Sequence, residues 1–143
     1  MRILFLCTGN RARSQMAEGL AHKLAAPGVE VFSAGTKPNP KGVHPSAVEM
    51  LRRSGVDASA YRPKHVDELQ GEFDYVITLC DRAAQECPMF PARRGRLHWG
   101  LPDPDAAGGD PAKELEMFRQ IFGELEARLR QWLAEQGILK PGA

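Results

Sequence analysis

Cys7 and Arg13 are the residues of this chain whose types and spacing point most directly to chemistry. Five residues separate them, and Ser14 follows at once. A cysteine thiolate is a nucleophile, and a guanidinium can contact two oxygens of a tetrahedral anion with its planar fork. We therefore predict that residues 7–14, here called the oxyanion loop, bind a tetrahedral oxyanion that Cys7 attacks. The backbone between the two residues would supply further contacts, from Thr8, Gly9, Asn10, Arg11 and Ala12.

The surroundings of the oxyanion loop make this pattern specific. A buried strand is predicted over 2–6, Gly9 and Asn10 tolerate unusual backbone angles, and Arg13 and Ser14 open a helix. Backbone N–H groups and a helix N-terminus then converge on one point that attracts an anion. The same donors, with Ser14, should lower the pKa of Cys7 below its usual ~8.5. The alternative is that Cys7 is a small buried hydrophobe and Arg13 a surface charge.

Two further cysteines follow a later predicted strand. Cys80 ends that strand, and Cys87 lies seven residues on, across a short polar segment that could be helical. A rigid helix would hold their sulfurs about 10 Å apart, whereas a disulfide needs Cα atoms within about 7 Å. The two thiols can therefore bond only if the segment between them loosens. The alternative is that they are unrelated.

Asp103 is the candidate proton donor. It precedes Pro104 in a loop after the last predicted strand, and a carboxylic acid that faces the nucleophile can protonate a leaving oxygen. An Asp in a proline-rich loop is more often a turn former, so this role depends on the oxyanion loop. Trp99, just before that loop, is interpreted as a core residue.

Hydrophobic periodicity gives the elements that must position these residues. Short apolar or β-branched runs predict strands at 2–6, 29–34, 73–79 and 96–99. Helical spacing predicts helices at 14–24, 45–54, a short one from about 81 to 87, and a long one from 110 to 137. This alternation indicates an α/β fold, with a four-stranded parallel sheet flanked by helices on both faces. Ligands bind at the carboxyl ends of such strands, where Cys7, Cys80 and Asp103 would converge.

Composition limits the remaining possibilities. With 143 residues, 43% of them hydrophobic, residues 1–143 are expected to form one domain. A net charge of +1 gives no reason to expect nucleic acid or a membrane as a partner. The apolar start is too short for a signal peptide or a membrane span. Three cysteines suit reduced thiols rather than a disulfide framework, so we expect a cytoplasmic protein, and a monomer.

At the oxyanion loop the sequence resembles the low-molecular-weight protein tyrosine phosphatase fold, whose Cys-x5-Arg-Ser loop follows the first strand. The longer stretch 7–19 is more similar to the thioredoxin-coupled arsenate reductases built on that fold. The resemblance continues over nearly the whole chain, at 33–36, 44–45, 55–57, 79–81 and 103–104. Two positions depart from it, since Arg11 stands where a serine is usual and Ala12 where a cysteine is common.

The resemblance to the reductases implies a relay of three thiols that reduces arsenate to arsenite. Cys7 would attack the oxyanion, Cys80 would attack the Cys7 adduct, and Cys87 would move the disulfide outward to reduced thioredoxin. Phosphate and sulfate would bind as mimics of arsenate. Asp103 matches the general acid of both families, but residues 105–109 lack the aromatic wall usual in the phosphatases. A small inorganic oxyanion therefore fits better than an aryl ester.

The resemblance also raises the question of a metal. Some of the reductases bind potassium beneath the loop, and Asn10, Glu18 and Ser33 fall at matching positions. The segment that would complete the site reads Tyr61-Arg62-Pro63-Lys64, whose positive charge disfavours a cation. No His and Cys cluster has the spacing of a transition-metal site. We predict no tightly bound metal and no other bound cofactor.

Two alternative functions remain. A phosphatase of the same fold would use only Cys7, Arg13 and Asp103. The reductase would also need Cys80 and Cys87, so the presence of these two cysteines distinguishes the two functions. A non-catalytic phosphate sensor would retain the loop alone. The presence of both a nucleophile and an acid counts against the sensor.

Overall fold

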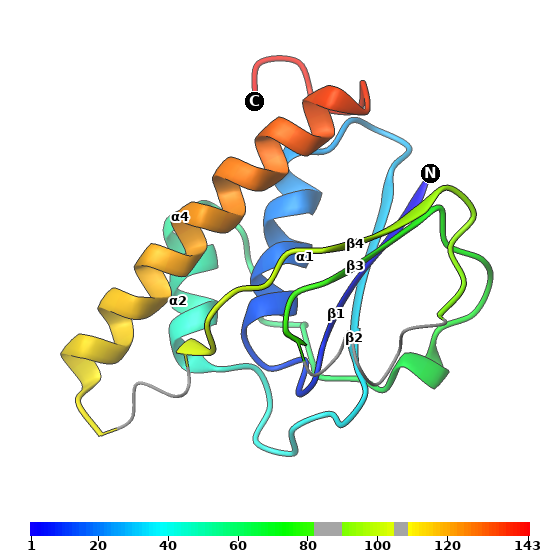
Figure 1. The fold of residues 1–143 in the computed structure, drawn as a ribbon. Coiled ribbons are helices and arrows are strands. Elements are labelled where there is room, and N and C mark those ends of the chain that lie inside the picture. The colour runs from blue at the N-terminus through cyan, green and yellow to red at the C-terminus, as the bar shows by residue number, and fades with distance from the viewer. Residues whose placement is uncertain (82–89, 105–108) are drawn as a thin grey trace.

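The computed structural model describes residues 1–81, 90–104 and 109–143. Along these ranges the elements are β1 (Arg2–Cys7), α1 (Arg13–Leu24), β2 (Glu30–Gly35), α2 (Pro45–Arg53), the 3-10 helix η1 (Val66–Glu68), β3 (Tyr75–Thr78), β4 (Gly95–His98) and α4 (Pro111–Glu135) (Figure 1). The predicted elements in these ranges are present, with ends shifted by a residue or two. The short helix predicted from about residue 81, and with it Cys87, lies outside the described residues.

The four strands form one parallel sheet in the order β2-β1-β3-β4, which confirms the predicted α/β fold. β1 lies in the centre, where Leu6 pairs with Ala34 on one side and with Thr78 on the other. Because the strands are parallel, their carboxyl ends share one edge, which faces downward in Figure 1. The oxyanion loop leaves β1 at that edge.

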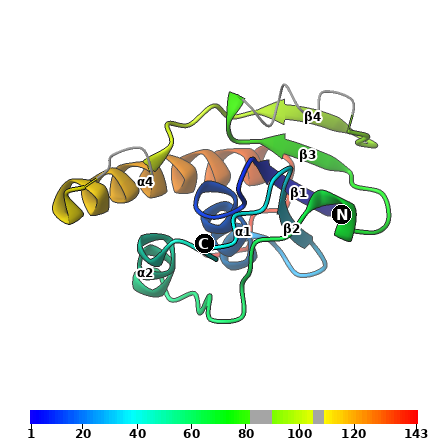
Figure 2. The same cartoon turned by 90° about the horizontal axis from the view of Figure 1, so that it is seen from below.

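Residues of β1 alternate between two apolar layers. Ile3 and Phe5 face a core that α1, α2 and α4 complete, and these helices lie together beside the sheet in Figure 2. Leu4 and Leu6 face the opposite side, where Val66 of η1 packs with Phe73. The described helices therefore cover both faces, with the three α-helices on one and the 3-10 helix on the other. None of these helices combines the length and apolarity that crossing a bilayer needs.

An aromatic cluster connects the core to the candidate site. The ring of Trp99 lies 6.4 Å from Phe5 and 6.0 Å from Trp132, which in turn meets Tyr75 edge-on at 4.9 Å. Trp99 is thus a core residue, as predicted. Two residues later, the N–H of Leu101 donates to the carbonyl of Leu79 at 3.0 Å. Packing and this hydrogen bond therefore fix the start of the loop that carries Asp103.

Candidate active site

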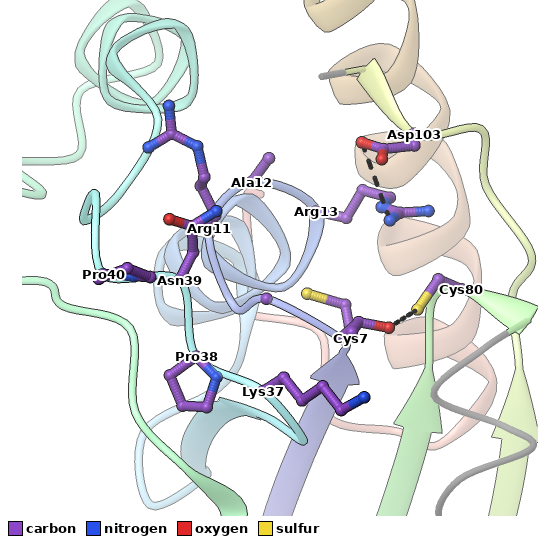
Figure 3. A pocket seen from close by; sticks show the side chains of 12 residues that line it. Cys7, Arg11, Ala12, Arg13, Lys37, Pro38, Asn39, Pro40, Cys80 and Asp103 are labelled. Carbon is purple, nitrogen blue, oxygen red and sulfur yellow. Dashed lines mark hydrogen bonds and ion pairs between the residues drawn. The ribbon is translucent and has the colours of Figure 1, made fainter. Parts of the chain in front are cut away.

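Most of the predicted site residues line one pocket of about 610 Å³ at the carboxyl edge of the sheet: Cys7, Thr8, Gly9, Arg11, Ala12, Arg13, Cys80 and Asp103. Asn10 and Ser14 are buried behind this lining, and Cys87 lies outside the described residues. Figure 3 shows Cys7 at the end of β1, Cys80 just past β3, and Arg13 beside Asp103, with the ion pair between them drawn as a dashed line. The same pocket has a wall that the sequence did not indicate, formed by Lys37, Pro38, Asn39 and Pro40. This segment follows β2, the neighbour of β1, so the topology of the sheet brings it against the oxyanion loop.

The oxyanion loop is held in place through its carbonyl groups. The carbonyls of Thr8, Gly9 and Arg11 accept hydrogen bonds from the N–H groups of Lys37, Asn39 and His44, each at 2.9 Å. In a planar trans peptide the following N–H points the opposite way. The N–H groups of Gly9, Asn10 and Ala12 are therefore directed away from segment 37–44, which leaves a row of donors on the other side of the loop.

Gly35 explains how closely the loop approaches β2. A Cβ atom at this position would overlap the carbonyl oxygen of Thr8 and would lie 3.0 Å from the backbone nitrogen of Asn10. Both contacts are with backbone atoms, which cannot rotate out of the way as a flexible side chain can. Only a glycine fits at this end of β2 while the loop keeps its path.

Asn10 sets the turn of the loop. Among the described residues it is the one non-glycine with a positive φ, 49°, a backbone region that asparagine tolerates better than most residues. Its side chain is fully buried. The Nδ2 group donates to Ser14 Oγ at 2.6 Å and to Ser33 Oγ at 3.1 Å, while Oδ1 accepts from Gln15 Nε2 and from the Lys64 N–H. Asn10 thus ties the loop to α1, β2 and the segment before η1.

Cys7 is buried with its sulfur 2.8 Å from Ser14 Oγ. Because Ser14 accepts from Asn10, its own proton is available to the sulfur. Burial nevertheless raises the pKa of Cys7, and this effect outweighs the hydrogen bonds from Ser14 and the charge of Arg13, which lower it. The predicted lowering of the Cys7 pKa is therefore wrong for this structure. The cost of burying the thiolate is larger than the stabilisation by its donors.

Arg13 links the oxyanion loop to the Asp103 loop. Its Nη1 donates to the carbonyl of Leu101 at 2.8 Å, and its Nη2 lies 3.9 Å from Asp103 Oδ1. The Arg13 side chain is only 12% exposed, whereas that of Asp103 is 53% exposed at the pocket mouth. The predicted proton donor thus lines the same pocket as the nucleophile and contacts Arg13 there. Residues 105–108, which follow it, lie outside the described residues.

Cys80 shares the pocket with Cys7 and is also buried. The sulfur of Cys80 lies 3.3 Å from Thr8 Oγ1, so the second thiol contacts the residue next to the nucleophile (Figure 3). On either side of Cys80, Thr78 Oγ1 and Asp81 Oδ1 lie 2.7 Å and 2.8 Å from the two ring nitrogens of His98. The sequence did not suggest these two contacts of His98. They fix the backbone on both sides of Cys80.

Arg11 stands at the rim of the pocket. Its Nη1 donates to the carbonyl of Gly42 at 2.8 Å, so its guanidinium braces the segment after β2. Among the described residues that line the pocket, Arg11, Arg13 and Lys37 carry positive charge and Asp103 alone carries negative charge. Such a lining attracts an anion locally, although the whole chain is nearly neutral.

Lys64 lies beneath the oxyanion loop. Its Nζ is 3.5 Å from Ser33 Oγ, 3.4 Å from the carbonyl of Arg62 and 3.8 Å from Glu18 Oε1. Burial lowers the pKa of Lys64, and the charge of Glu18 opposes that effect. Gln15 completes this layer, since its Nε2 contacts the Asn10 carbonyl and the Arg62 carbonyl, each at 3.0 Å. Its buried Oε1 has no hydrogen-bond partner among the described residues.

Comparisons with known proteins agree with this architecture. An arsenate reductase of Halalkalibacterium halodurans is 40% identical over 136 residues, which span 94% of this chain and 96% of that protein. The structure of an arsenate reductase in the phosphate binding state has a TM-score of 0.79 and 31% identity over 94% of this chain and 97% of that one.

Two further solved structures are also similar. A thioredoxin-dependent arsenate reductase of Corynebacterium glutamicum has a TM-score of 0.68 and 32% identity, over 94% of this chain and 60% of that one. An arginine phosphatase has a TM-score of 0.72 and 30% identity over 95% of each chain. Residues 2–140 match the family described as low molecular weight phosphotyrosine protein phosphatase. The chain belongs to that family.

Proposed function

We propose that this protein reduces arsenate to arsenite through a relay of Cys7, Cys80 and Cys87, with thioredoxin as the reductant. The observation that carries the proposal is the position of Cys80. Its sulfur lines the same pocket as Cys7 and contacts Thr8 of the oxyanion loop at 3.3 Å. A phosphatase needs one thiol there, whereas a reductase needs two. The names of similar proteins support the same activity.

Binding of arsenate would use the oxyanion loop and Arg13. The N–H groups of Gly9, Asn10 and Ala12 point away from segment 37–44, and the guanidinium of Arg13 can supply its planar fork. Phosphate has the same shape and charge, and a similar arsenate reductase is known in a phosphate binding state. Phosphate and sulfate should therefore compete with arsenate.

The first chemical step would form a bond between Cys7 Sγ and arsenic. The pKa of Cys7 is raised by burial, so the thiol must first give up its proton, and the bound arsenate dianion can accept it. The thiolate then attacks arsenic, and an arsenic–oxygen bond breaks. Asp103, which lines the same pocket, would protonate the departing oxygen, which leaves as water. Arsenic remains in oxidation state V at this stage.

The second step would reduce the arsenic. Cys80 Sγ attacks Cys7 Sγ, so that a sulfur–sulfur bond forms and the sulfur–arsenic bond breaks. The electron pair of the broken bond stays on arsenic, which leaves as arsenite in oxidation state III. The two thiols together lose two electrons and become a disulfide. The contact of Cys80 with the residue next to Cys7, and the pocket that the two thiols share, support this step.

The third step would regenerate Cys7. Cys87 would attack Cys80, release the Cys7 thiolate and leave a Cys80–Cys87 disulfide for the dithiol of reduced thioredoxin. Cys87 lies outside the described residues, so its role is supported by its place in the sequence and by the resemblance. A similar thioredoxin-dependent arsenate reductase supports the choice of reductant. This chemistry suits the reducing conditions of the cytoplasm.

A phosphatase is the second candidate, because an arginine phosphatase is similar over most of the chain. Cys7, Arg13 and Asp103 suffice for that reaction, in which water hydrolyses a phosphocysteine. No aromatic side chain is present among the described residues that line the pocket. An aryl ester would therefore find no ring to stack on among these residues, while a small oxyanion needs none.

The deciding assay is arsenate-dependent consumption of NADPH with thioredoxin and thioredoxin reductase supplied. Wild-type protein should sustain turnover, and Cys7→Ser should abolish it, because the loop does not ionise a hydroxyl. Cys80→Ser should also abolish it, yet hydrolysis of a small aryl phosphate should survive in that variant. No reduction by the wild type, alongside brisk phosphate hydrolysis, would favour the phosphatase.

Cys87→Ser tests the order of the relay. This variant should complete about one turnover and then stall with a Cys7–Cys80 disulfide, since no third thiol can move the bond outward. Mass spectrometry of tryptic peptides after arsenate treatment detects that link. Sustained thioredoxin-dependent reduction by Cys87→Ser or by Cys80→Ser would refute the three-thiol sequence.

A further inference from the structure

The oxygen atoms beneath the oxyanion loop form an environment suited to a cation. A hydroxyl from Ser33, a carbonyl from Arg62 and a carboxylate from Glu18 converge there, and the side chains of Ser33 and Glu18 are buried. Hard monovalent and divalent cations take such oxygen ligands. The other carboxylate oxygen of Glu18 lies 3.9 Å from the exposed ring of His22. A positive charge among the three oxygens would compensate the buried carboxylate from the side of the loop.

Lys64 supplies that charge from the chain itself. Its Nζ lies within 3.8 Å of all three oxygens. A potassium ion bound by the same oxygens would lie beside the ammonium and be repelled by it. The residues present therefore do not fit the potassium site that the resemblance implied at Asn10, Glu18 and Ser33.

The backbone of Lys64 is fixed on both sides. Its N–H donates to Asn10 Oδ1 at 3.0 Å, and its carbonyl accepts from the Gly35 N–H at 2.9 Å. The side chain thus starts from a fixed point directly under the loop. Substitution of the side chain leaves both backbone hydrogen bonds available, so the charge can be tested apart from the backbone.

A continuous path of contacts runs from Lys64 to the nucleophile. The ammonium contacts Ser33, Ser33 accepts from Asn10, Asn10 also donates to Ser14, and Ser14 lies 2.8 Å from Cys7 Sγ. The Lys64 ammonium and the Asn10 amide thus contact the same Ser33 hydroxyl, and the ammonium orients it. A change at Lys64 would therefore alter how Asn10 holds the loop, without any contact between Lys64 and the bound anion.

We propose that the Lys64 ammonium is a built-in replacement for a monovalent cation, and that it positions the oxyanion loop through Ser33 and Asn10. Lys64 is thus a positioning residue. This proposal depends on oxyanion binding and not on arsenate reduction. It makes oxyanion binding by this protein independent of potassium.

Two substitutions separate charge from volume. Lys64→Ala removes the ammonium and opens space among the three oxygens, which a potassium ion can fill. Lys64→Met removes the charge but keeps most of the volume. Lys23→Ala is the matched control, because Lys23 Nζ also donates to a carbonyl, that of Ser54, but on an exposed part of α1. Calorimetric titration with inorganic phosphate and the melting temperature are measured in potassium chloride and in choline chloride of equal ionic strength.

The wild type and Lys23→Ala should bind phosphate equally in the two salts. Lys64→Ala should bind about tenfold more weakly in choline chloride, the loss expected for one charge-assisted contact, and should recover affinity and melting temperature in potassium chloride. Lys64→Met should stay weak in both. Potassium-dependent affinity in the wild type, unchanged affinity in Lys64→Ala, or a loss that potassium does not restore would each overturn the proposal. A wild type that binds no phosphate would refute the oxyanion loop itself, and the melting temperatures would still test Lys64.

Discussion

Asn10 offers the sharpest test of how the oxyanion loop is held, because one buried side chain joins four neighbours. Asn10→Ala removes its hydrogen bonds with Ser14, Ser33, Gln15 and the Lys64 N–H, and it places alanine at a φ of 49°. Asn10→Gly removes the same hydrogen bonds but tolerates that φ. The pair separates the cost of the lost side chain from the cost of the backbone conformation.

The expected magnitudes follow from these contacts. Each buried hydrogen bond contributes about 1 kcal/mol net, so the loss of four should lower the free energy of unfolding by about 4 kcal/mol in both variants. For alanine, the left-handed backbone conformation lowers the free energy of unfolding by roughly a further 1–2 kcal/mol. For glycine, the greater entropy of the unfolded chain lowers it by about 0.5–1 kcal/mol. Asn10→Gly should therefore be more stable than Asn10→Ala by about 0.5–1 kcal/mol. A domain with a typical stability of about 5–15 kcal/mol survives either change in weakened form.

Urea unfolding followed by far-ultraviolet circular dichroism measures these differences, provided that the slope of the transition stays constant. Asn39→Ala is the control, since the Asn39 side chain is bonded to Lys41 in an exposed turn and should contribute less than about 1 kcal/mol. An Asn10→Ala protein within about 1 kcal/mol of the wild type would refute the structural role of the side chain. An Asn10→Gly protein less stable than Asn10→Ala would refute the role assigned to the backbone angle.

Three other substitutions test the chemistry of the pocket. Ser14→Ala removes the hydrogen bond that opposes the effect of burial on Cys7, so the already raised pKa of Cys7 should rise further. The rate of alkylation by iodoacetamide should then reach its plateau at higher pH than in the wild type. An unchanged pH profile would contradict this. Arg13→Lys should weaken phosphate binding about tenfold or more in calorimetry, since an ammonium cannot reproduce the fork, and unchanged affinity would remove Arg13 from the cradle. Asp103→Asn should slow oxyanion transfer by about 10²–10⁴-fold with little change in phosphate affinity. If Asp105→Asn is slow while Asp103→Asn stays active, Asp105 is the proton donor instead.

The fold was predictable because its signals are local. The apolar run of β1 is buried on both faces, as in a central parallel strand, and Pro45 and Pro111 stand in the first turn of α2 and α4. The alternation of strand and helix then leaves few topologies, and right-handed crossovers bring the carboxyl ends of the strands to one edge. The convergence of Cys7 and Cys80 followed from that rule alone.

The contacts that tune the site were not predictable because they join distant parts of the chain. Arg13 donates to a carbonyl 88 residues away, and the Lys64 N–H reaches the Asn10 side chain across 54 residues. The sequence indicated that Lys64 disfavours a cation, but not that its ammonium would occupy that place. The Cys7 pKa was predicted with the wrong sign because it depends on a balance between burial and nearby donors. The donors can be read from the loop, but the depth of burial is set by the whole core.

The choice between reductase and phosphatase depends on which group reaches the Cys7 adduct first. Water must enter from the pocket mouth, whereas Cys80 lies in contact with Thr8 and is fixed by the Leu79 N–H, which donates to the Leu6 carbonyl at 2.8 Å. A thiol held in the same pocket as Cys7 acts at a high effective concentration. With arsenic, attack by Cys80 on Cys7 Sγ would release a stable arsenite and so complete the proposed reduction. With phosphorus the same attack has no accessible leaving group, so the adduct would persist until water hydrolyses it. One pocket would therefore act as a reductase on arsenate and as a slow hydrolase on phosphate esters.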